Sequence, residues 1–270
     1  MNNIFNIKRF GFAFRKDILE NWKRYTLLFL TLLGLMVAMT VFQTREYIKI
    51  QYIDEDFCIH LNNSMLTFLT ILFFAAGIWF ASTFATPINS RLKRLTYLIN
   101  PASNFEKYLT RWSITTIGFI VAFFVAIWMA DLLRVSICTV IYPDVELPFI
   151  NITKYIQDVE GKKVFFCLYF LLQSIFLLGA TIWEKASFIK TFIAVAIFFG
   201  AYIVVCRWTI LLFYGDMDGY YNVLQSFDLS HTFSQEQALS LLSIIMTVFT
   251  ITFWVLACFR IRESEITKRI

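Results

Sequence analysis

Six long apolar runs constrain the fold of this 270-residue chain more than any other feature. They cover residues 25–44, 61–90, 112–130, 164–183, 191–206 (continuing past Arg207 to Tyr214) and 237–259. A helix rises about 1.5 Å per residue, so roughly 20 apolar residues cross a hydrocarbon core about 30 Å thick. The runs are apolar on every side and lack the alternation of an outer-membrane barrel strand. We therefore expect an all-α, polytopic membrane bundle of about six transmembrane helices.

Composition agrees with a single membrane domain. Charged residues make up 16% of the chain, whereas a soluble domain carries about 25%. No internal repeat or separate soluble segment is visible, so we expect one six-span domain over residues 25–260 and a short tail over 261–270. The first 24 residues contain no short apolar core followed by a small-residue cleavage site, so the first run is expected to stay as an anchor.

The basic residues are distributed unevenly between the two sides of these runs. If both termini lie inside, the inner segments carry 17 Lys and Arg residues, the outer segments carry six, and Arg207 lies within a run. The positive-inside rule then predicts a bacterial inner-membrane protein with cytoplasmic N- and C-termini. The net charge of +5 reflects this orientation, and no nucleic-acid partner is expected.

Residues 1–24 have the pattern of an amphipathic helix that precedes the first span. Apolar residues and one glycine recur every three or four positions, at Ile4, Ile7, Gly11, Phe14, Ile18 and Trp22. Lys8 and Arg15 flank this apolar stripe, while Arg9, Lys16 and Arg24 point away from it. The pattern predicts an interfacial helix in contact with membrane lipid headgroups. The alternatives are that this segment packs against a soluble protein, or that it is only a basic flank of the first span.

The segment 86–112, between the second and third spans, predicts a protruding elbow. Ser103 and Glu106 have the S-x-x-E spacing of a capping box, which predicts a helix starting at about Asn104. Pro101 prevents the preceding segment from running straight into that helix. The helix can continue through Trp112 into the third span. A docking elbow and an ordinary capped reverse turn both fit these residues.

Sequence motifs for catalysis are absent from the chain. No G-x-x-x-x-G-K-[ST], G-x-S-x-G or H-E-x-x-H pattern occurs, and no paired carboxylates lie in the apolar runs. We therefore expect a protein that is not an enzyme and that needs no cofactor. Two histidines make a metal site unexpected. Cys58 and Cys138 both lie on the outer side, and the sequence leaves open whether they form a disulfide.

Three charged residues lie within or at the ends of the apolar runs. Asp131 and Arg134 are three residues apart and share a helical face, which favours an ion pair at the membrane boundary over a transport site. Arg207 follows a run of only 16 residues, so its side chain can reach the outer headgroups. The alternatives for Arg207 are an ion pair with a residue such as Asp131, or a position that faces the cargo.

Residues 100–112 read Asn-Pro-Ala-Ser-Asn-Phe-Glu-Lys-Tyr-Leu-Thr-Arg-Trp. This stretch is similar to the "LPAS…EK…RW" stretch of the ABC-2 type permease family, particularly its divergent Bacteroidetes-type members. Asn100 stands where leucine is commoner. The six spans and the preceding amphipathic helix also resemble that family.

The resemblance implies that the elbow is a coupling helix that docks on a separate ABC ATPase. The residues that would mediate this contact are Pro101, Ser103, Asn104, Phe105, Glu106 and Lys107. Phe105 would fill an apolar groove of the ATPase, whereas Glu106 could instead cap its own helix. Two permease copies, identical or different, would pair to form the transport path.

These expectations lead to a leading function and to rivals. The leading function is the permease subunit of an ABC-type exporter that moves an amphipathic or lipid-like cargo, since few charges lie within the spans. The alternative is a membrane scaffold or sensor that does not transport and whose outer residues, such as Tyr220 and Tyr221, bind a partner. A membrane-embedded enzyme is disfavoured because no polar groups cluster at one depth.

Overall fold

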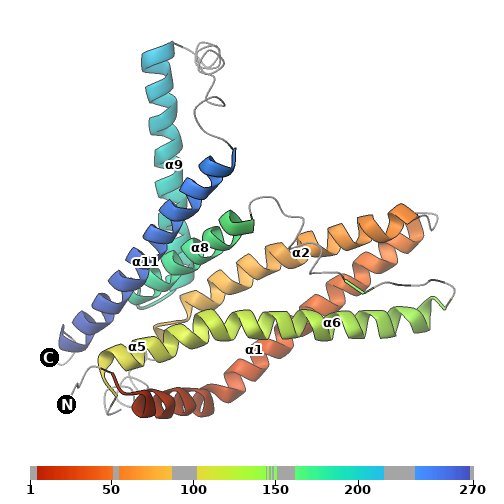
Figure 1. Cartoon of the computed structure of the whole chain (residues 1–270), viewed down its shortest axis with the longest axis horizontal. Helices are drawn as coiled ribbons and strands as arrows, with labels where there is room; N and C mark the ends of the chain where they lie inside the picture. The colour runs from red at the N-terminus through yellow and green to blue at the C-terminus, as the bar shows by residue number, and fades with distance from the viewer. Residues whose placement is uncertain are drawn as a thin grey trace. The chain divides into compact units, whose positions relative to one another are not determined.

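The computed structural model describes residues 5–50, 55–86, 102–143, 145, 147, 149–150, 162–215 and 235–267. Within these ranges the chain is all-α (Figure 1). Its helices are α1 (Ile7–Ile50), α2 (Glu55–Ser82), α5 (Asn104–Ser113), the π-helix η1 (Ile114–Gly118), α6 (Phe119–Ile141), α8 (Lys162–Ile182), α9 (Ser187–Tyr214) and α11 (Gln235–Thr267). Six helical stretches are long and apolar enough to cross a membrane, with α5, η1 and α6 forming one of them. The predicted all-α polytopic membrane bundle is thus confirmed.

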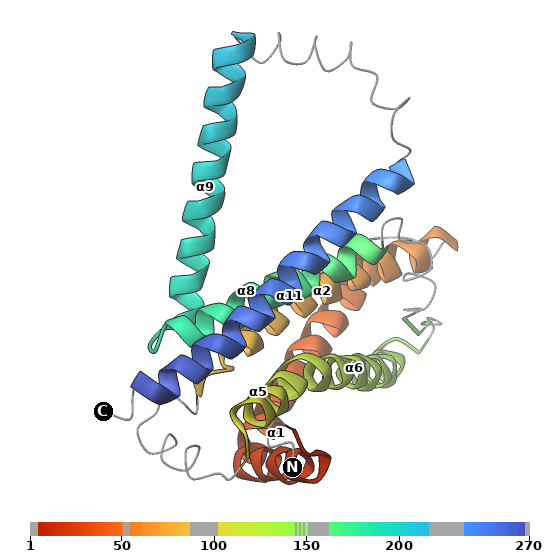
Figure 2. The same cartoon turned by 60° about the vertical axis from the view of Figure 1, so that its left-hand side comes forward.

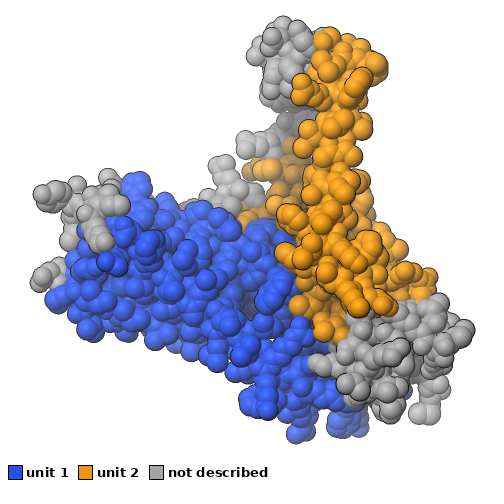
Figure 3. Space-filling model, turned by 180° about the vertical axis from the view of Figure 1, so that it is seen from behind, with its two compact units in different colours: residues 1–80, 94–160 blue, residues 81–93, 161–270 orange. Residues whose placement is uncertain are grey.

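The chain divides into two compact units, which Figure 3 shows in different colours. Unit 1 comprises Met1–Phe80 and Arg94–Glu160, and it contains α1, nearly all of α2, α5, η1 and α6. Unit 2 comprises Ala81–Lys93 and Gly161–Ile270, and it contains α8, α9 and α11.

In unit 1, aromatic contacts fix the directions of the helices. Tyr25 near the start of the first apolar run meets Phe80 near the end of α2, with ring centroids 6.3 Å apart. At the other end of the same pair, the buried Leu61 packs against Tyr47. Helices α1 and α2 are therefore antiparallel, as consecutive membrane spans must be.

Helix α6 continues the alternation of helix direction within unit 1. Phe73 of α2 lies 4.9 Å from Phe123, and Phe80 lies 5.9 Å from Phe119, measured between ring centroids. Because the numbers rise along α2 as they fall along α6, these two helices are also antiparallel. Stacked and edge-on rings at such distances contribute about 0.5–1.5 kcal/mol beyond their burial.

The N-terminal segment is helical from Ile7, and its helix continues into the first span. Described residues from Ile7 onward belong to α1, which runs without a break to Ile50. The first turns of α1, dark red in Figures 1 and 2, run at an angle to the rest of the helix. Ile7, Ile18 and Trp22 of the predicted apolar stripe are exposed. Contact of that stripe with lipid headgroups stays a prediction.

The elbow helix begins where the capping box predicts. Ser103 is the N-cap of α5 and Asn104 is its first residue. The helix then continues through η1 into α6, as expected, although the π-turn itself was not predicted. At the other terminus, α11 extends to Thr267, so most of the predicted tail over 261–270 is helical.

Unit 2 is built on a tight hairpin of α8 and α9. Only residues 183–186 connect them, and Ala186 has a left-handed backbone conformation with φ of 52°. Phe176 lies 5.6 Å from Phe188 between ring centroids, and Gly179 faces Thr191. These contacts make α8 and α9 antiparallel neighbours.

Helix α11 packs along α8 in the parallel direction. Cys167 contacts Thr247 with its sulfur 3.5 Å from the hydroxyl oxygen, and Phe170 lies 6.1 Å from Trp254 between ring centroids. Parallel fourth and sixth spans are what six alternating crossings require. The order of crossings inferred from the sequence therefore agrees with the packing inside each unit.

Candidate functional site

The carboxylate of Glu106 joins the N-termini of α1 and α5. Its Oε2 accepts from the backbone N–H of Ser103 at 2.8 Å, and the Ser103 hydroxyl accepts from the Glu106 N–H at 3.2 Å. Its Oε1 accepts from the backbone N–H of Asn6 at 2.7 Å and from Arg9 Nη2 at 3.1 Å. Glu106 is fully buried, with 0% of its surface exposed.

This arrangement places one negative charge at the start of two helices. Asn6 precedes α1, and its side-chain oxygen accepts from the Lys8 N–H at 3.0 Å in the manner of an N-cap. A carboxylate near a helix N-terminus is favourable because the free N–H groups carry partial positive charge. Glu106 therefore does more than cap its own helix: it fastens the start of α1 to the first turn of α5.

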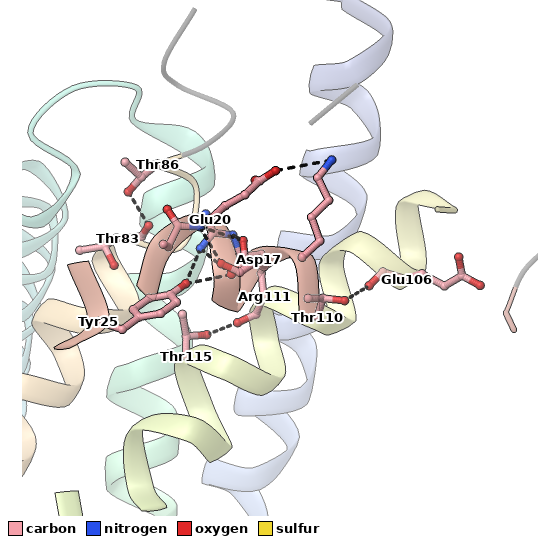
Figure 4. Close-up of polar contacts among 11 residues, drawn as sticks. Asp17, Glu20, Tyr25, Thr83, Thr86, Glu106, Thr110, Arg111 and Thr115 are labelled. Carbon is pink, nitrogen blue, oxygen red and sulfur yellow. Dashed lines mark hydrogen bonds and ion pairs between the residues drawn. The ribbon is translucent and has the colours of Figure 1, made fainter. Parts of the chain in front are cut away.

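A second polar cluster lies two turns farther along α1 (Figure 4). The Tyr25 hydroxyl donates to Asp17 Oδ2 at 2.9 Å and accepts from Arg111 Nη1 at 3.1 Å. Arg111 Nε also lies 3.4 Å from Asp17 Oδ1, and Asn21 Nδ2 donates to the same oxygen at 3.3 Å. Arg111 is nine-tenths buried, so these charged groups are held largely away from water.

These two clusters reveal a face of α1 that the sequence reading missed. Asp17, Asn21 and Tyr25 recur every four residues, which places them on one side of a helix. That side packs on α5 through the charged residues above, while the apolar stripe lies on another side. The four-residue spacing of polar residues was the available signal. Their partner Arg111 lies too far away in sequence for any local pattern to identify it.

The cluster around Arg111 carries an excess of positive charge. Arg24 lies close enough to Arg111 and Asp17 for their charges to interact. Two guanidinium groups therefore lie near the carboxylate of Asp17. Within the described part of the chain, Arg111 Nη2 is buried and has no hydrogen-bond partner. A buried donor without a partner costs about 1–3 kcal/mol, so this atom is an unfavourable feature of the cluster.

The predicted ATPase-contact residues lie in different environments. Phe105 is 44% exposed, and its ring meets Phe5 edge-on at 6.3 Å between centroids. Ser103 and Asn104 are half-buried. Glu106 and Lys107 are buried, so in this structure they are not part of a surface that a partner could reach. The remaining candidate, Pro101, lies outside the described residues.

The predicted pair of Asp131 and Arg134 is formed. Arg134 donates to Asp131 Oδ1 from Nε at 2.8 Å and from Nη2 at 2.7 Å. Asp131 Oδ2 accepts from the backbone N–H of Ile150 at 2.8 Å. Both side chains are buried, with Arg134 only 1% exposed. The pair holds the segment after α6 to that helix, which is a structural role.

Arg207 lies on an exposed face of α9, seven residues before its end at Tyr214. No ion pair joins Arg207 to another residue in the ranges that the structure describes. The carboxylate of Asp131, its alternative partner, is bound by Arg134. The exposed position agrees with a side chain that reaches toward lipid headgroups.

Beside the Arg111 cluster, unit 1 contains an open apolar groove of about 930 Å³. Its walls come from α1, α2, η1 and the start of α6. The lining residues are Phe10, Phe14, Ile18, Tyr25, Leu28, Phe29, Thr31, Leu32, Leu35, Leu72, Ala75, Ala76, Trp79, Phe80, Ser113, Ile114, Ile117, Gly118, Phe119, Val121 and Ala122. Part of one wall is the π-turn, a feature often found at functional sites.

Three other features considered from the sequence are a metal site, the disulfide and the outer tyrosines. Among the described residues, no three His, Cys, Asp or Glu side chains gather to hold a metal ion. Cys138 is a buried free thiol, so the disulfide left open above is not formed. Tyr220 and Tyr221 lie outside the described residues.

Comparisons with protein-family models, curated proteins and solved structures find no match to this chain. The resemblance to ABC-2 type permeases therefore still rests on residues 100–112 and on the order of the spans. The sequence and the structure together establish an all-α, multi-pass membrane protein with a buried charged junction between its first helix and its elbow.

Proposed function

We propose that this chain is the membrane-spanning subunit of an ABC-type exporter, driven by a separate ATPase subunit. The observation that carries the proposal is the Glu106 junction. An elbow that transmits force must be attached rigidly to the membrane helices. Here one buried carboxylate joins the elbow α5 to α1, while the chain itself joins α5 to α6.

In this proposal the ATPase docks on the exposed edge of the elbow at Phe105. A push on Phe105 moves α5, and the Glu106 and Arg111 contacts carry the movement to α1. Through η1 the same movement reaches α6. Two spans on either side of the apolar groove would then shift together, which is a means of opening and closing a path for cargo.

The proposed cargo is amphipathic or lipid-like, because the groove is apolar and Tyr25 in its wall is hydrogen-bonded to the charged residues Asp17 and Arg111. Two permease copies, identical or different, would form the path. The proposed setting is the bacterial inner membrane with both termini and the elbow in the cytoplasm, supported by the 17 basic residues on that side. A cysteine introduced at Asn104 would then resist an impermeant thiol reagent applied to intact cells, and labelling there would overturn this orientation.

The docking proposal is tested by purification of the tagged full-length protein from its native membranes in mild detergent. We expect a soluble protein with a phosphate-binding loop to copurify with the wild type and to be lost with Phe105→Asp. Burying a carboxylate in an apolar contact costs several kcal/mol, so the loss should be nearly complete.

Phe149→Asp is the matched control, because Phe149 is also exposed and follows α6 at the opposite end of unit 1 from α5. This variant should retain the ATPase. If the wild type retains no ATPase, or if Phe105→Asp retains as much as the control, the docking proposal is wrong.

A further inference from the structure

The depth of the apolar groove matches one leaflet of a bilayer. Outside the first apolar run, the groove is lined by the first turns of α1 as far as Phe10. Within that run, from Tyr25 to Leu35, it follows ten residues of α1, a rise of about 15 Å. The hydrocarbon core is about 30 Å thick, so this length is about half of it. On the opposite wall the groove follows α2 from Phe80 back to Leu72, so both walls cover a similar depth.

The charged edge of the apolar runs crosses the groove at Tyr25. On α1 the charged residues Lys23 and Arg24 precede Tyr25, after which no charge occurs until Arg45. On the third span Arg111 is the last charged residue before a long uncharged run. The 3.1 Å bond between Arg111 and Tyr25 brings these two boundaries together. The groove therefore runs from the headgroup level into the core of one leaflet.

The shape of the groove suits a single extended chain. Leu35, Trp79, Ile117 and Val121 line it and remain about half exposed, so it is open along its side. Small residues, among them Ala75 and Ala76 of α2, leave room between the larger walls. A chain that enters sideways from the bilayer would cover this apolar surface.

The polar end of the groove selects for negative charge. Tyr25 lines the groove and binds Arg111, whose Nη2 is buried without a partner in the described structure. Arg24 adds a second guanidinium, and Asp17 neutralises only one of the two. Guanidinium groups form paired, charge-assisted hydrogen bonds with phosphate oxygens. An anion beside Tyr25 would lie next to this charged cluster and balance its excess positive charge.

We propose that the groove binds one acyl chain of an anionic membrane phospholipid, with the lipid phosphate at Arg111 and Arg24. The bound lipid would lie between α1, α2 and η1, where it would hold the elbow end of unit 1 in one arrangement. This site does not depend on the exporter proposal, because it requires only the groove, its charged end and a bilayer.

The test uses the delipidated full-length protein in detergent, titrated with phosphatidylglycerol or with phosphatidylcholine of identical acyl chains. Native mass spectrometry measures the fraction of protein that carries one lipid. We expect the wild type to prefer phosphatidylglycerol by about tenfold, because its headgroup has a net negative charge whereas the phosphate of phosphatidylcholine is offset by a choline cation. Arg111→Gln should therefore weaken the binding of phosphatidylglycerol more than that of phosphatidylcholine and remove most of the preference. A merely structural role of Arg111 would instead weaken the binding of both lipids by the same factor.

The groove itself is tested by filling it. Ala76→Trp should reduce the binding of both lipids about tenfold or more, and Ala122→Trp fills the same groove from α6 if the first variant does not fold. Ala196→Trp and Arg207→Gln, at exposed positions of α9, are the matched controls and should bind as the wild type does. Equal binding of the two lipids by the wild type, or full binding by a folded filled variant, would overturn the proposal.

Discussion

Two parts of the molecule differ in how much of their side-chain surface is buried within the chain. They are the junction between α1 and α5 in unit 1 and the helix α9 in unit 2. At the junction, charged side chains are buried and bound to one another, with Glu106 at 0% exposure. In α9, the most apolar stretch is only 6% buried within the chain. Lipid tails are as apolar as the side chains of α9, so the exposure of that helix carries no hydrophobic cost.

The contrast indicates where specific structure is concentrated. An apolar helix surrounded by lipid tolerates many substitutions, because no particular neighbour is needed. A buried charge tolerates few, because its partners must occupy defined positions. The charged contacts of unit 1 are therefore the places where substitution should affect the protein most, and α9 beyond its first turns is where it should affect the protein least.

The largest effect is expected from Asp131→Ala. Arg134 is 1% exposed, so removal of its carboxylate partner leaves a buried charge uncompensated. Such a loss destabilises by about 3–5 kcal/mol. Thermal unfolding of the purified protein in detergent, followed by circular dichroism, measures the change.

The double variant Asp131→Leu with Arg134→Met is the control, because it removes both charges and keeps much of the apolar volume. Replacement of a buried pair by apolar residues is often close to neutral. We therefore expect the double variant to unfold at a higher temperature than the single one. A single variant as stable as the double one would contradict the buried-pair argument.

A smaller effect is expected from Glu106→Gln. The substitution keeps the shape of the side chain but removes the charge that Arg9 and two helix N-termini share. A hydrogen bond to a charged group contributes about 1.5–3 kcal/mol, and Arg9 is partly exposed, so we expect a loss of about 2 kcal/mol. The same unfolding measurement detects it.

Glu263→Gln is the matched control in unit 2. Glu263 also pairs with an arginine, Arg260 at 3.1 Å, but its side chain is 63% exposed. Exposed pairs contribute about 0–1 kcal/mol, so this variant should be close to the wild type. Equal losses from the two substitutions would show that burial does not distinguish the junction from a surface ion pair.

The features that sequence predicted well were local ones. Asn104 was placed at the start of α5 because the capping box of Ser103 and Glu106 spans only four residues. The pair of Asp131 and Arg134 was found because residues three apart share a helical face. The six spans were found because each is a continuous apolar run.

The features that were missed depend on residues distant in sequence. Arg9 is 97 residues from Glu106, and Asp17 is 94 from Arg111, so no local periodicity links them. The continuation of the N-terminal helix into the first span was also not predicted. Trp22-Lys-Arg-Tyr25 contains no glycine or proline to end a helix, so α1 continues through the charged boundary.

The smallest effects, and the sharpest comparison, come from the two glycines Gly179 and Gly200. A Cβ added at Gly179 would overlap Thr191 Oγ1 and lie 2.7 Å from its Cγ2 and 2.9 Å from its Cβ, so no rotation of that side chain removes the clash. Overpacking costs about 1–3 kcal/mol, and alanine regains up to about 1 kcal/mol in helix propensity. Gly179→Ala should therefore destabilise the protein by about 1 kcal/mol.

Gly200→Ala should have the opposite sign. Nothing in the described chain lies within 4 Å of the added Cβ, so the gain of up to about 1 kcal/mol in helix propensity remains. Thermal unfolding of both variants side by side gives the two signs directly. If Gly200→Ala also destabilised the purified protein, α9 would have to be covered by another polypeptide, such as a second copy of the chain. Its exposed apolar surface would then be an interface and not a lipid-facing wall.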